Sequence, residues 1–378
     1  MTKAVQSCES MTKRKVMHLV VAGDIGGAER FLVDLASRPA QSAAEHLVVA
    51  ISPNRKLVDY LRQADLKVVH RPCRSEGGLA YLWRTFGPSE LAWLGRLVQQ
   101  QGIEILHMHT FASHLLGVRV ALAHGIPSLR TEHGVRHYGD PTCAIYRHWA
   151  LRNTARVAAV SEFVARVVTN VEPSMADRVK VVHNGVDATR FRPSIMKPKL
   201  PLIALVLSRL EREKRVDLAI SALPLVPNVR LRIVGDGSYR DALVRLARRI
   251  EVNDRVEFLG YQADPRQAIA EADVLLNCTR HEGLGLSVLE AASMQRPAIA
   301  FAGGGIPEVI DDGLSGWLFK DHSPKALAAI LNTLASDRDA LKRCGIEARL
   351  RVEEHFTVEV MCAKYAAIYR ELTHGHRE

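Results

Sequence analysis

The stretch His281-Glu282-Gly283-Leu284-Gly285-Leu286-Ser287-Val288-Leu289-Glu290 indicates both how this chain folds and where it binds a ligand. It follows a short apolar run typical of a buried strand and leads into a pattern typical of a helix. Glu282 lies in the glycine-containing loop, and Glu290 lies eight residues later, about one turn into the helix. We expect the backbone amides near Leu286 and Ser287 to bind phosphate oxygens. A carboxylate is suited to accept hydrogen bonds from the vicinal hydroxyls of a ribose.

A helix cap with an incidental pair of acids is the alternative interpretation of this stretch. The glycines, the acids and the position between a strand and a helix coincide, and this coincidence favours a ligand site. The rest of the chain decides which ligand class is meant.

Short apolar runs alternate with helical patterns along most of the chain, which predicts parallel sheets with crossover helices. The strands expected before residue 190 are 16–22, 46–51, 67–70, 103–108, 128–131, 156–160 and 179–183, and the helices include 28–36, 88–101 and 112–124. Prolines at 193, 198 and 201 then predict a linker. After it, the expected strands are 202–207, 229–234, 255–259, 274–277, 298–301 and 316–319, with helices at 215–222 and 241–250.

The predicted fold is therefore α/β, with two Rossmann-like domains that face each other across a cleft. Residues 1–195 form the first domain, which we expect to bind the second substrate, and residues 196–356 form the second. A helical pattern at 357–372 lies in the last segment, 357–378, which we expect to pack back across the linker. A ligand would lie between the domains, at the carboxyl ends of the strands.

Composition excludes several classes of protein. Hydrophobic residues make up 47% and charged residues 24% of the 378, which argues against disorder. No run of about 18 apolar residues predicts a membrane-spanning helix, and the basic start lacks the apolar core of a signal peptide, so a cytoplasmic location is expected. The six cysteines contain no C-x-x-C pair, which favours reduced thiols over a zinc ribbon.

Positive charge is concentrated in the first half of the chain. The net charge is +10, and residues 1–195 contain 25 basic and 16 acidic residues, so nearly the whole surplus lies there. A basic half could face nucleic acid, an anionic membrane or an anionic substrate, and composition alone does not choose among them.

Two cations follow the expected strand 202–207. Arg209 comes directly after it and Lys214 lies at the next helix start, so both point to the carboxyl end of the sheet. The planar fork of arginine and the point charge of lysine suit a diphosphate. Alternatively, Glu211 and Glu213 simply pair with these cations at an exposed helix start.

Gly26 and Gly27 lie between the first expected strand and its helix. Adjacent glycines let backbone amides approach an anionic ligand at a helix start, although a tight turn needs them equally. The loop lacks the G-x-G-x-x-G spacing, which disfavours a dinucleotide site.

Taken together, these motifs resemble glycosyltransferase family 4, whose members are retaining glycosyltransferases with the GT-B fold. The stretch from Glu282 to Glu290 is similar to the E-x7-E motif of that family. The resemblance spans about residues 16–320 and includes, in the family's order, Gly26-Gly27, Thr131-Glu132-His133-Gly134, Ala159-Val160-Ser161-Glu162, His183-Asn184-Gly185-Val186-Asp187, Phe191, Arg209, Lys214, Val234-Gly235-Asp236-Gly237 and Gly303-Gly304-Gly305-Ile306-Pro307-Glu308.

The resemblance implies a nucleotide-diphosphate sugar as the donor and gives each residue a role. Arg209 and Lys214 would bind the diphosphate, Glu290 the ribose, and Glu282 would lie near the hydroxyls of the sugar. His133 would lie beside the reacting sugar and, with Arg209, Lys214 and Glu282, would form the catalytic set. The remaining donor-binding positions would be Gly26, Gly27, Gly283, Leu284, Gly285, Leu286 and Gly304.

Three positions depart from the family pattern. Ser208 and Arg215 stand where the family commonly has glycine, and Leu284 replaces a frequent phenylalanine. None of the three changes removes a charged group, so we expect a small shift in donor geometry and not a loss of activity.

The resemblance also implies retention without a protein nucleophile. The acceptor hydroxyl would attack on the face that the diphosphate leaves and pass its proton to the phosphate. Arg209 and Lys214 would then be the main catalysts, because they meet the charge that grows as the bond breaks. No metal or cofactor is expected, since Asp337-Arg338-Asp339, the one Asp-x-Asp sequence, is typical of a solvated helix start.

Four histidines have spacings that are compatible with metal ligands. They are His107 with His109, and His133 with His137, but no carboxylate or cysteine completes either set. We therefore expect His107 and His109 in a polar loop, and His137 exposed or on the acceptor side.

The expected function is metal-independent, retaining transfer of a sugar to a glycan or lipid-linked acceptor, in bacterial cell-surface polysaccharide or glycolipid synthesis. The basic first half would face an anionic acceptor or the inner face of a membrane, where Tyr81, Trp83 and Phe86 would either touch the surface or pack inward. A nucleotide-sugar epimerase of the same fold is the alternative enzyme. A nucleic-acid-binding protein is the alternative from another class, and dispersed basic residues without a binding motif disfavour it.

Overall fold

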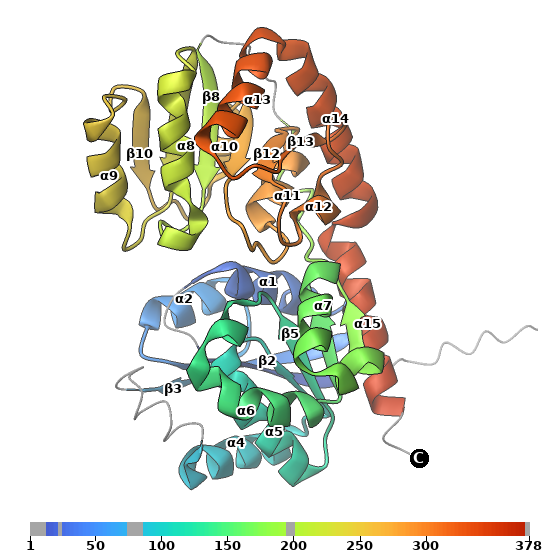
Figure 1. The fold of residues 1–378 in the computed structure, drawn as a ribbon. Coiled ribbons are helices and arrows are strands. Elements are labelled where there is room, and N and C mark those ends of the chain that lie inside the picture. The colour runs from blue at the N-terminus through green and yellow to red at the C-terminus, as the bar shows by residue number, and fades with distance from the viewer. Residues whose placement is uncertain (1–12, 22–24, 74–85, 194–200, 375–378) are drawn as a thin grey trace, which may run out of the picture.

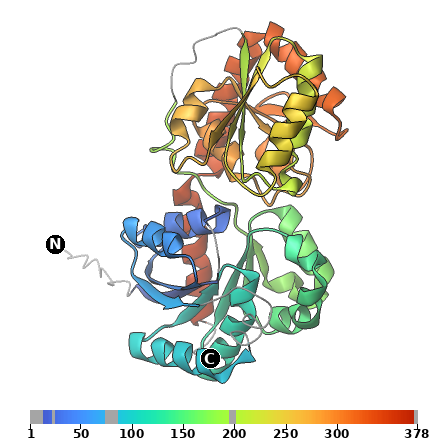
Figure 2. The same ribbon diagram turned by 90° about the vertical axis from the view of Figure 1, so that its left-hand side faces the viewer.

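The computed structural model describes residues 13–21, 25–73, 86–193 and 201–374, and shows two α/β lobes (Figure 1). Each lobe is built on one parallel sheet flanked by helices, which confirms the predicted fold class. A view turned by 90° shows the lobes stacked one above the other (Figure 2). Most of the expected linker, together with Tyr81 and Trp83, lies outside the described residues.

The first lobe contains a seven-stranded sheet in the order β3-β2-β1-β4-β5-β6-β7. Its strands are β1 (Arg14–Val21), β2 (Ala44–Ser52), β3 (Val68–Pro72), β4 (Ile105–Met108), β5 (Ser128–Glu132), β6 (Arg156–Ala159) and β7 (Val179–Val181). Its helices are α1 (Gly27–Ala36), α2 (Arg55–Gln63), α4 (Pro88–Gln101), α5 (Phe111–His124), α6 (Pro141–Arg152) and α7 (Glu162–Val171), with 3-10 turns η1 (Arg136–Gly139) and η2 (Pro173–Arg178).

The second lobe contains a six-stranded sheet in the order β10-β9-β8-β11-β12-β13. Its strands are β8 (Leu202–Leu207), β9 (Val229–Val234), β10 (Val256–Gly260), β11 (Val274–Asn277), β12 (Ala298–Phe301) and β13 (Gly316–Phe319). Its helical elements are η3 (Arg212–Lys214), α8 (Val216–Ala222), η4 (Leu223–Leu225), α9 (Arg240–Arg249), α10 (Arg266–Glu271), α11 (Leu286–Ser293), α12 (Ile306–Val309), α13 (Pro324–Ser336) and α14 (Arg338–His355).

The two sheets share one strand order. In each, the chain runs outward from the first strand to one edge and then returns to add strands on the other side, so β1 lies between β2 and β4, and β8 lies between β9 and β11. In open parallel sheets, ligands bind outside the carboxyl ends of the strands at this switch point. The loops after β1, β8 and β11 therefore mark the places where a site can form.

Central strands are buried on both faces, which explains their continuous apolar runs. All four residues of β4 and all four of β11 are buried. The polar residue within β4, His107, needs hydrogen-bond partners there, because a buried polar group without one is costly.

The last two helices join the lobes along one side (Figure 1). α14 lies on the second lobe, and α15 (Val358–His374) packs on α1 and β4 of the first. Val186 donates its N–H to the Phe356 carbonyl at 2.8 Å and accepts from the Val358 N–H at 3.2 Å. These two hydrogen bonds fix the place where the chain returns from the second lobe to the first, between α14 and α15. No helix among the described residues is long and apolar enough to cross a membrane.

Candidate active site

Loops from the two lobes touch at the ends of β5, β11 and β12. A β-carbon on Gly283 would overlap the carbonyl oxygen of His133, so only glycine permits this approach. Gly304 has φ +63° and lies against the backbone of Glu282, while the Gly305 N–H donates to the Glu282 carbonyl at 2.9 Å. The structure thus brings Gly283, Gly304 and His133 together, although they are far apart in the sequence.

The acid-pair loop has the shape that its sequence predicts. α11 begins directly after Gly285, whose φ of +100° suits glycine, and Glu290 is its fifth residue. Leu284 is buried, and Leu286, at the start of the helix, lies 3.4 Å from a β-carbon built on Gly27. The starts of α1 and α11 therefore meet between the lobes.

Lys214 contacts Glu282 and neither of the nearer acids. Its Nζ lies 2.8 Å from Glu282 Oε2. Burial raises the pKa of Glu282, but the Lys214 ammonium and hydrogen bonds outweigh it and hold that pKa below its usual value. Glu211 bonds Ser238, and Glu213 pairs with Arg136, so the alternative in which these acids neutralise Lys214 is not what the structure shows.

The other predicted phosphate ligand, Arg209, is exposed. It forms no hydrogen bond or ion pair with the residues that the structure describes. Beside it, Ser208 Oγ is buried and without a partner in the same described ranges. An exposed guanidinium next to an unsatisfied hydroxyl is suited to an anionic ligand that satisfies both.

Arg215, at the position where the family commonly has glycine, adopts a positive φ of +50°. This conformation is costly for a residue with a β-carbon, which explains why glycine would suit it. The guanidinium is held by Asp217, with Nε 3.1 Å from Oδ1, and lies 3.2 Å from His322 Nδ1. Those contacts keep Arg215 bound to its own lobe.

Arg30 is a site residue that the sequence did not indicate. From α1 of the first lobe its Nη1 lies 3.1 Å from Glu290 Oε1 in the second. Burial raises the pKa of Glu290, and Arg30 and Arg190 oppose this rise. The carboxylate expected to bind ribose is therefore already in contact with a cation.

The Gly26 amide, expected to contact the diphosphate, is also occupied. It donates to Glu29 Oε2 at 2.8 Å, which forms the first turn of α1. A ligand would have to displace this bond in order to use the Gly26 N–H.

A second contact between the lobes lies near the site. Glu308 accepts hydrogen bonds from the Glu162 and Phe163 amides at 2.8 and 3.0 Å and lies 3.0 Å from His183 Nε2. An acid of the second lobe thus caps α7 of the first.

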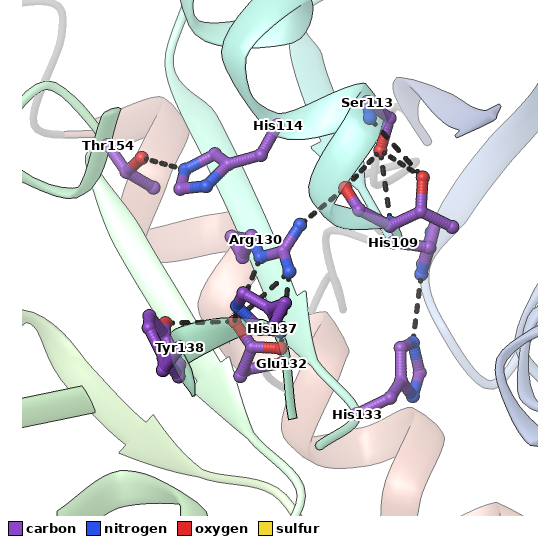
Figure 3. A network of polar contacts seen from close by, with 10 residues as sticks. His109, Ser113, His114, Arg130, Glu132, His133, His137, Tyr138 and Thr154 are labelled. Atoms are coloured by element: carbon purple, nitrogen blue, oxygen red, sulfur yellow. Dashed lines mark hydrogen bonds and ion pairs between the residues drawn. The ribbon is translucent and has the colours of Figure 1, made fainter. Parts of the chain in front are cut away.

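A buried ion pair lies beside His133 at the end of β5 (Figure 3). Arg130 bonds both carboxylate oxygens of Glu132 at 3.1–3.2 Å, and the Tyr138 hydroxyl donates to the same carboxylate at 3.0 Å. Burial raises the pKa of Glu132, but Arg130, His137 and Tyr138 overcome it and hold that pKa well below its usual range. The pair gives a rigid base to the loop that carries His133.

The expectation of a polar loop is wrong for His107, which lies within β4. His109 does lie directly after that strand, but the side chains of both histidines are buried. Hydrogen bonds make this possible: the ring nitrogens of His107 lie 2.9 Å from the Tyr369 hydroxyl and 2.7 Å from the Thr131 hydroxyl. His137 lies where Glu132 can accept from it, with 3.4 Å between Nε2 and Oε2.

His18, His107 and His109 form a group in which one ring nitrogen from each lies within 4.8 Å of the others. Imidazole is a common metal ligand, yet both ring nitrogens of His18 and of His107 already have hydrogen-bond partners. That no metal is needed stays a prediction. Asp337 accepts from the Ala340 N–H at 2.9 Å as the N-cap of α14, so this acid does form a helix start as expected.

Burial of neutral histidines makes stability fall in acid. Burial lowers the pKa of a group of histidines that includes His18, His46, His107, His109 and His114. The pKa of His46 falls from 6.5 to about 4. Below pH 6.5 the unfolded chain therefore binds protons that the folded chain refuses. We expect the free energy of unfolding, measured with urea, to fall as pH is lowered, by at most about 1.4 kcal/mol per pH unit for each proton that unfolding takes up.

The exposed His355 provides the control for this prediction. The variant His355→Gln should keep the slope, because it removes a histidine from the surface and leaves in place the histidines whose pKa burial lowers. A free energy of unfolding that stays constant between pH 6.5 and pH 5 would contradict the prediction.

Two matches to known families cover most of the chain. Residues 25–190 match the family described as "Glycosyltransferase Family 4", and residues 187–351 match "Glycosyl transferases group 1". The chain belongs to glycosyltransferase family 4. It is a nucleotide-sugar-dependent glycosyltransferase, as the motifs predicted.

Relatives of this family 4 enzyme act on different acceptors. This chain is 26% identical over 328 residues to a glycogen synthase of Mycobacterium tuberculosis, and the match covers 78% of this chain and 79% of the relative. It is also 26% identical to a D-inositol 3-phosphate glycosyltransferase of Streptomyces scabiei, covering 96% and 90%. The structure of Anabaena Alr3699/HepE in complex with UDP and glucose superimposes with a TM-score of 0.83 at 22% identity, covering 95% of this chain and all of that one. This similarity confirms the GT-B fold.

Proposed function

We propose that this enzyme transfers a hexose from a UDP-sugar to a glycan or lipid-linked acceptor, with retention and without a metal ion. The observation that carries the proposal is the position of Lys214, which is 2.8 Å from Glu282 in the loop that leads to Glu290. One cation and two acids at the carboxyl ends of β8 and β11 suit a diphosphate, a sugar and a ribose in that order. Support for uridine as the base comes from the UDP in the HepE structure.

Chemistry at this site depends on stabilising the leaving diphosphate. Lys214 and Arg209 would meet the negative charge that develops as the sugar–phosphate bond breaks. To do so, Lys214 would share its ammonium between Glu282 and the phosphate. Glu282 would then accept from sugar hydroxyls and fix the orientation of the ring, while the acceptor hydroxyl attacks on the same face and gives its proton to the phosphate.

Charge supports an anionic acceptor or membrane surface for the first lobe. Residues 1–195 hold nine more basic than acidic residues, whereas the remainder holds 26 basic and 25 acidic residues. Phe86, from the expected aromatic cluster, is 40% exposed. Such a lobe would suit cell-surface polysaccharide or glycolipid synthesis at the inner face of a bacterial membrane.

The test is turnover of UDP-sugars in EDTA with glycan and lipid-linked acceptors. Proton NMR should show a product with the anomeric configuration of the donor. An inverted product, or activity that EDTA abolishes, would contradict the proposal. Deuterium exchange at the second carbon of the sugar without any acceptor would indicate the epimerase. As a matched control for the site, Glu290→Gln should weaken binding of UDP more than binding of pyrophosphate, because only UDP has a ribose.

A further inference from the structure

Four histidines form a continuous line of hydrogen bonds from the active site into the first lobe. We call His133, His109, His18 and His46 the histidine chain. The successive contacts are His133 Nε2 to His109 Nδ1 at 3.5 Å, His109 Nε2 to His18 Nδ1 at 2.8 Å, His18 Nε2 to His46 Nδ1 at 2.8 Å, and His46 Nε2 to Ser42 Oγ at 2.7 Å. Figure 3 shows the end of the chain at His133, which lies beside His109.

Ser42 sets the direction of these hydrogen bonds. Its Oγ lies 2.9 Å from the carbonyl oxygen of Arg38, which can only accept. The single hydroxyl proton of Ser42 therefore goes to Arg38, and Ser42 accepts from His46 Nε2–H.

The direction then passes from ring to ring. A neutral imidazole has one N–H and one lone pair, so a ring that donates with one nitrogen accepts with the other. His46 accepts from His18, His18 from His109, and His109 from His133 Nε2–H. His133 Nδ1 is left without a proton, as an acceptor.

The opposite direction makes one bond fewer. If Ser42 donated to His46, every ring would reverse, but the bond from Ser42 to the Arg38 carbonyl would be lost. A net hydrogen bond is worth about 0.5–1.5 kcal/mol, which favours the first direction by about two- to thirteen-fold. Burial also lowers the pKa of His133 to about 3, with Glu132 opposing it, so this ring is neutral.

His133 Nδ1 has the environment of a binding atom. It is buried and has no hydrogen-bond partner among the residues that the structure describes. The His133 carbonyl touches Gly283, so the backbone that carries this ring lies beside the loop that carries Glu282. A buried acceptor left without a partner is costly, and a ligand hydroxyl would remove that cost.

We propose that His109, His18, His46 and Ser42 are positioning residues that hold His133 as the Nε2–H tautomer, so that Nδ1 accepts a hydrogen bond from a sugar hydroxyl. This proposal rests on the proposed function, because it requires a sugar beside His133. It adds a direction to the contact: His133 accepts and the substrate donates. A sugar whose hydroxyl at this place is replaced by fluorine or hydrogen would lose the bond.

The first experiment needs no turnover. Nitrogen-15 NMR of histidine-labelled enzyme distinguishes the two tautomers and the imidazolium, and loss of a signal in His133→Asn assigns His133. We expect Nε2–H and a bare Nδ1 for His133 at pH 7.5. An Nδ1–H tautomer or an imidazolium would overturn the proposal, whatever the fate of the proposed function.

A metal ion would also overturn it. An ion held by His18, His107 and His109 would take the lone pairs that the chain uses. Elemental analysis of purified enzyme should therefore find no stoichiometric zinc, copper, nickel or iron, and one equivalent of any of them would contradict the chain.

The second experiment removes the end of the chain. In Ser42→Ala all four rings remain, but their direction is no longer fixed, so His133 should become a mixture of tautomers. We expect kcat to fall about two-fold, in proportion to the fraction of His133 that leaves the Nε2–H tautomer, with little change in KM for the donor or in the Kd of UDP.

Thr154→Val is the matched control. Thr154 Oγ1 bonds the Ala150 carbonyl four residues earlier at 2.7 Å and contacts buried His114 at 2.7 Å, as Ser42 does with Arg38 and His46. Among the described residues, no hydrogen bond or ring contact joins His114 to the histidine chain, so kcat should stay unchanged. Equal loss of kcat in the two variants, or an unchanged His133 spectrum in Ser42→Ala, would overturn the proposal.

Discussion

Replacing Lys214 with alanine should lower kcat by about 10²–10³-fold. We expect the ammonium, which lies 2.8 Å from Glu282, to contact the diphosphate, and loss of one group that meets developing charge typically has an effect of this size. Glu282 would also lose the partner at 2.8 Å that holds its pKa below the usual value, so its pKa should rise. Steady-state kinetics with a UDP-sugar donor, measured between pH 5 and pH 8, check both effects.

Arg212→Ala is the control for Lys214→Ala. Arg212 begins the same 3-10 turn and is exposed, so its removal changes the local charge equally without touching Glu282. Turnover should remain within about two-fold of the wild type, since a solvent-exposed charge is largely screened by salt and water. If both variants lose activity alike, the effect comes from general charge and Lys214 has no special role.

The contact between Arg30 and Glu290 suggests how the lobes and the donor depend on each other. It spans the two lobes and uses the carboxylate that ribose is expected to need. Ribose and Arg30 can share Glu290, because a carboxylate has two oxygens and several acceptor positions. Donor binding would then join Arg30 of the first lobe, Glu290 of the second lobe and the ribose in one network of polar contacts. This network would lie where the starts of α1 and α11 already meet.

Much of the second sheet could be predicted from sequence. The strands expected at 202–207, 229–234, 274–277, 298–301 and 316–319 have those bounds in the structure. Four of these strands are apolar or nearly so, and 229–234 alternates buried apolar residues with arginines, so local sequence is sufficient. The acid-pair loop was likewise predictable, because Gly285 and the helix after it are adjacent in the chain.

Contacts that depend on distant residues were not predictable. Nothing near His107 in the sequence shows that the hydroxyl of Tyr369, 262 residues away, will lie within hydrogen-bond distance of its ring in a buried strand. Arg30 meets Glu290 over 260 residues, and no spacing rule connects them. The helices at 55–63, 141–152 and 162–171 are not among those that the sequence pattern predicts. The position of the loop that carries His133 depends on its packing against Gly283, which is distant in the sequence.

The largest effect on stability should come from Arg130→Met. Arg130 and Glu132 have side chains that are only 2% and 3% exposed, and removing the guanidinium leaves a buried carboxylate without its main counter-charge. Such a loss typically lowers the free energy of unfolding by about 3–5 kcal/mol. Urea unfolding at pH 7.5 measures it. The exposed pair of Arg136 and Glu213 provides the control, since Arg136, 83% exposed, should give less than about 1 kcal/mol in Arg136→Met.

The pH dependence separates this ion pair from simple packing. The pKa of Glu132 lies below its unfolded value in the folded protein, so its stabilisation is present above about pH 4.5 and is lost as pH falls further. Arg130→Met should therefore differ most from the wild type near neutral pH and approach it in acid. The double variant Arg130→Met/Glu132→Leu should recover much of the loss, because it leaves no unpaired charge. A double variant no more stable than Arg130→Met would show that shape, and not charge, holds the His133 loop in place.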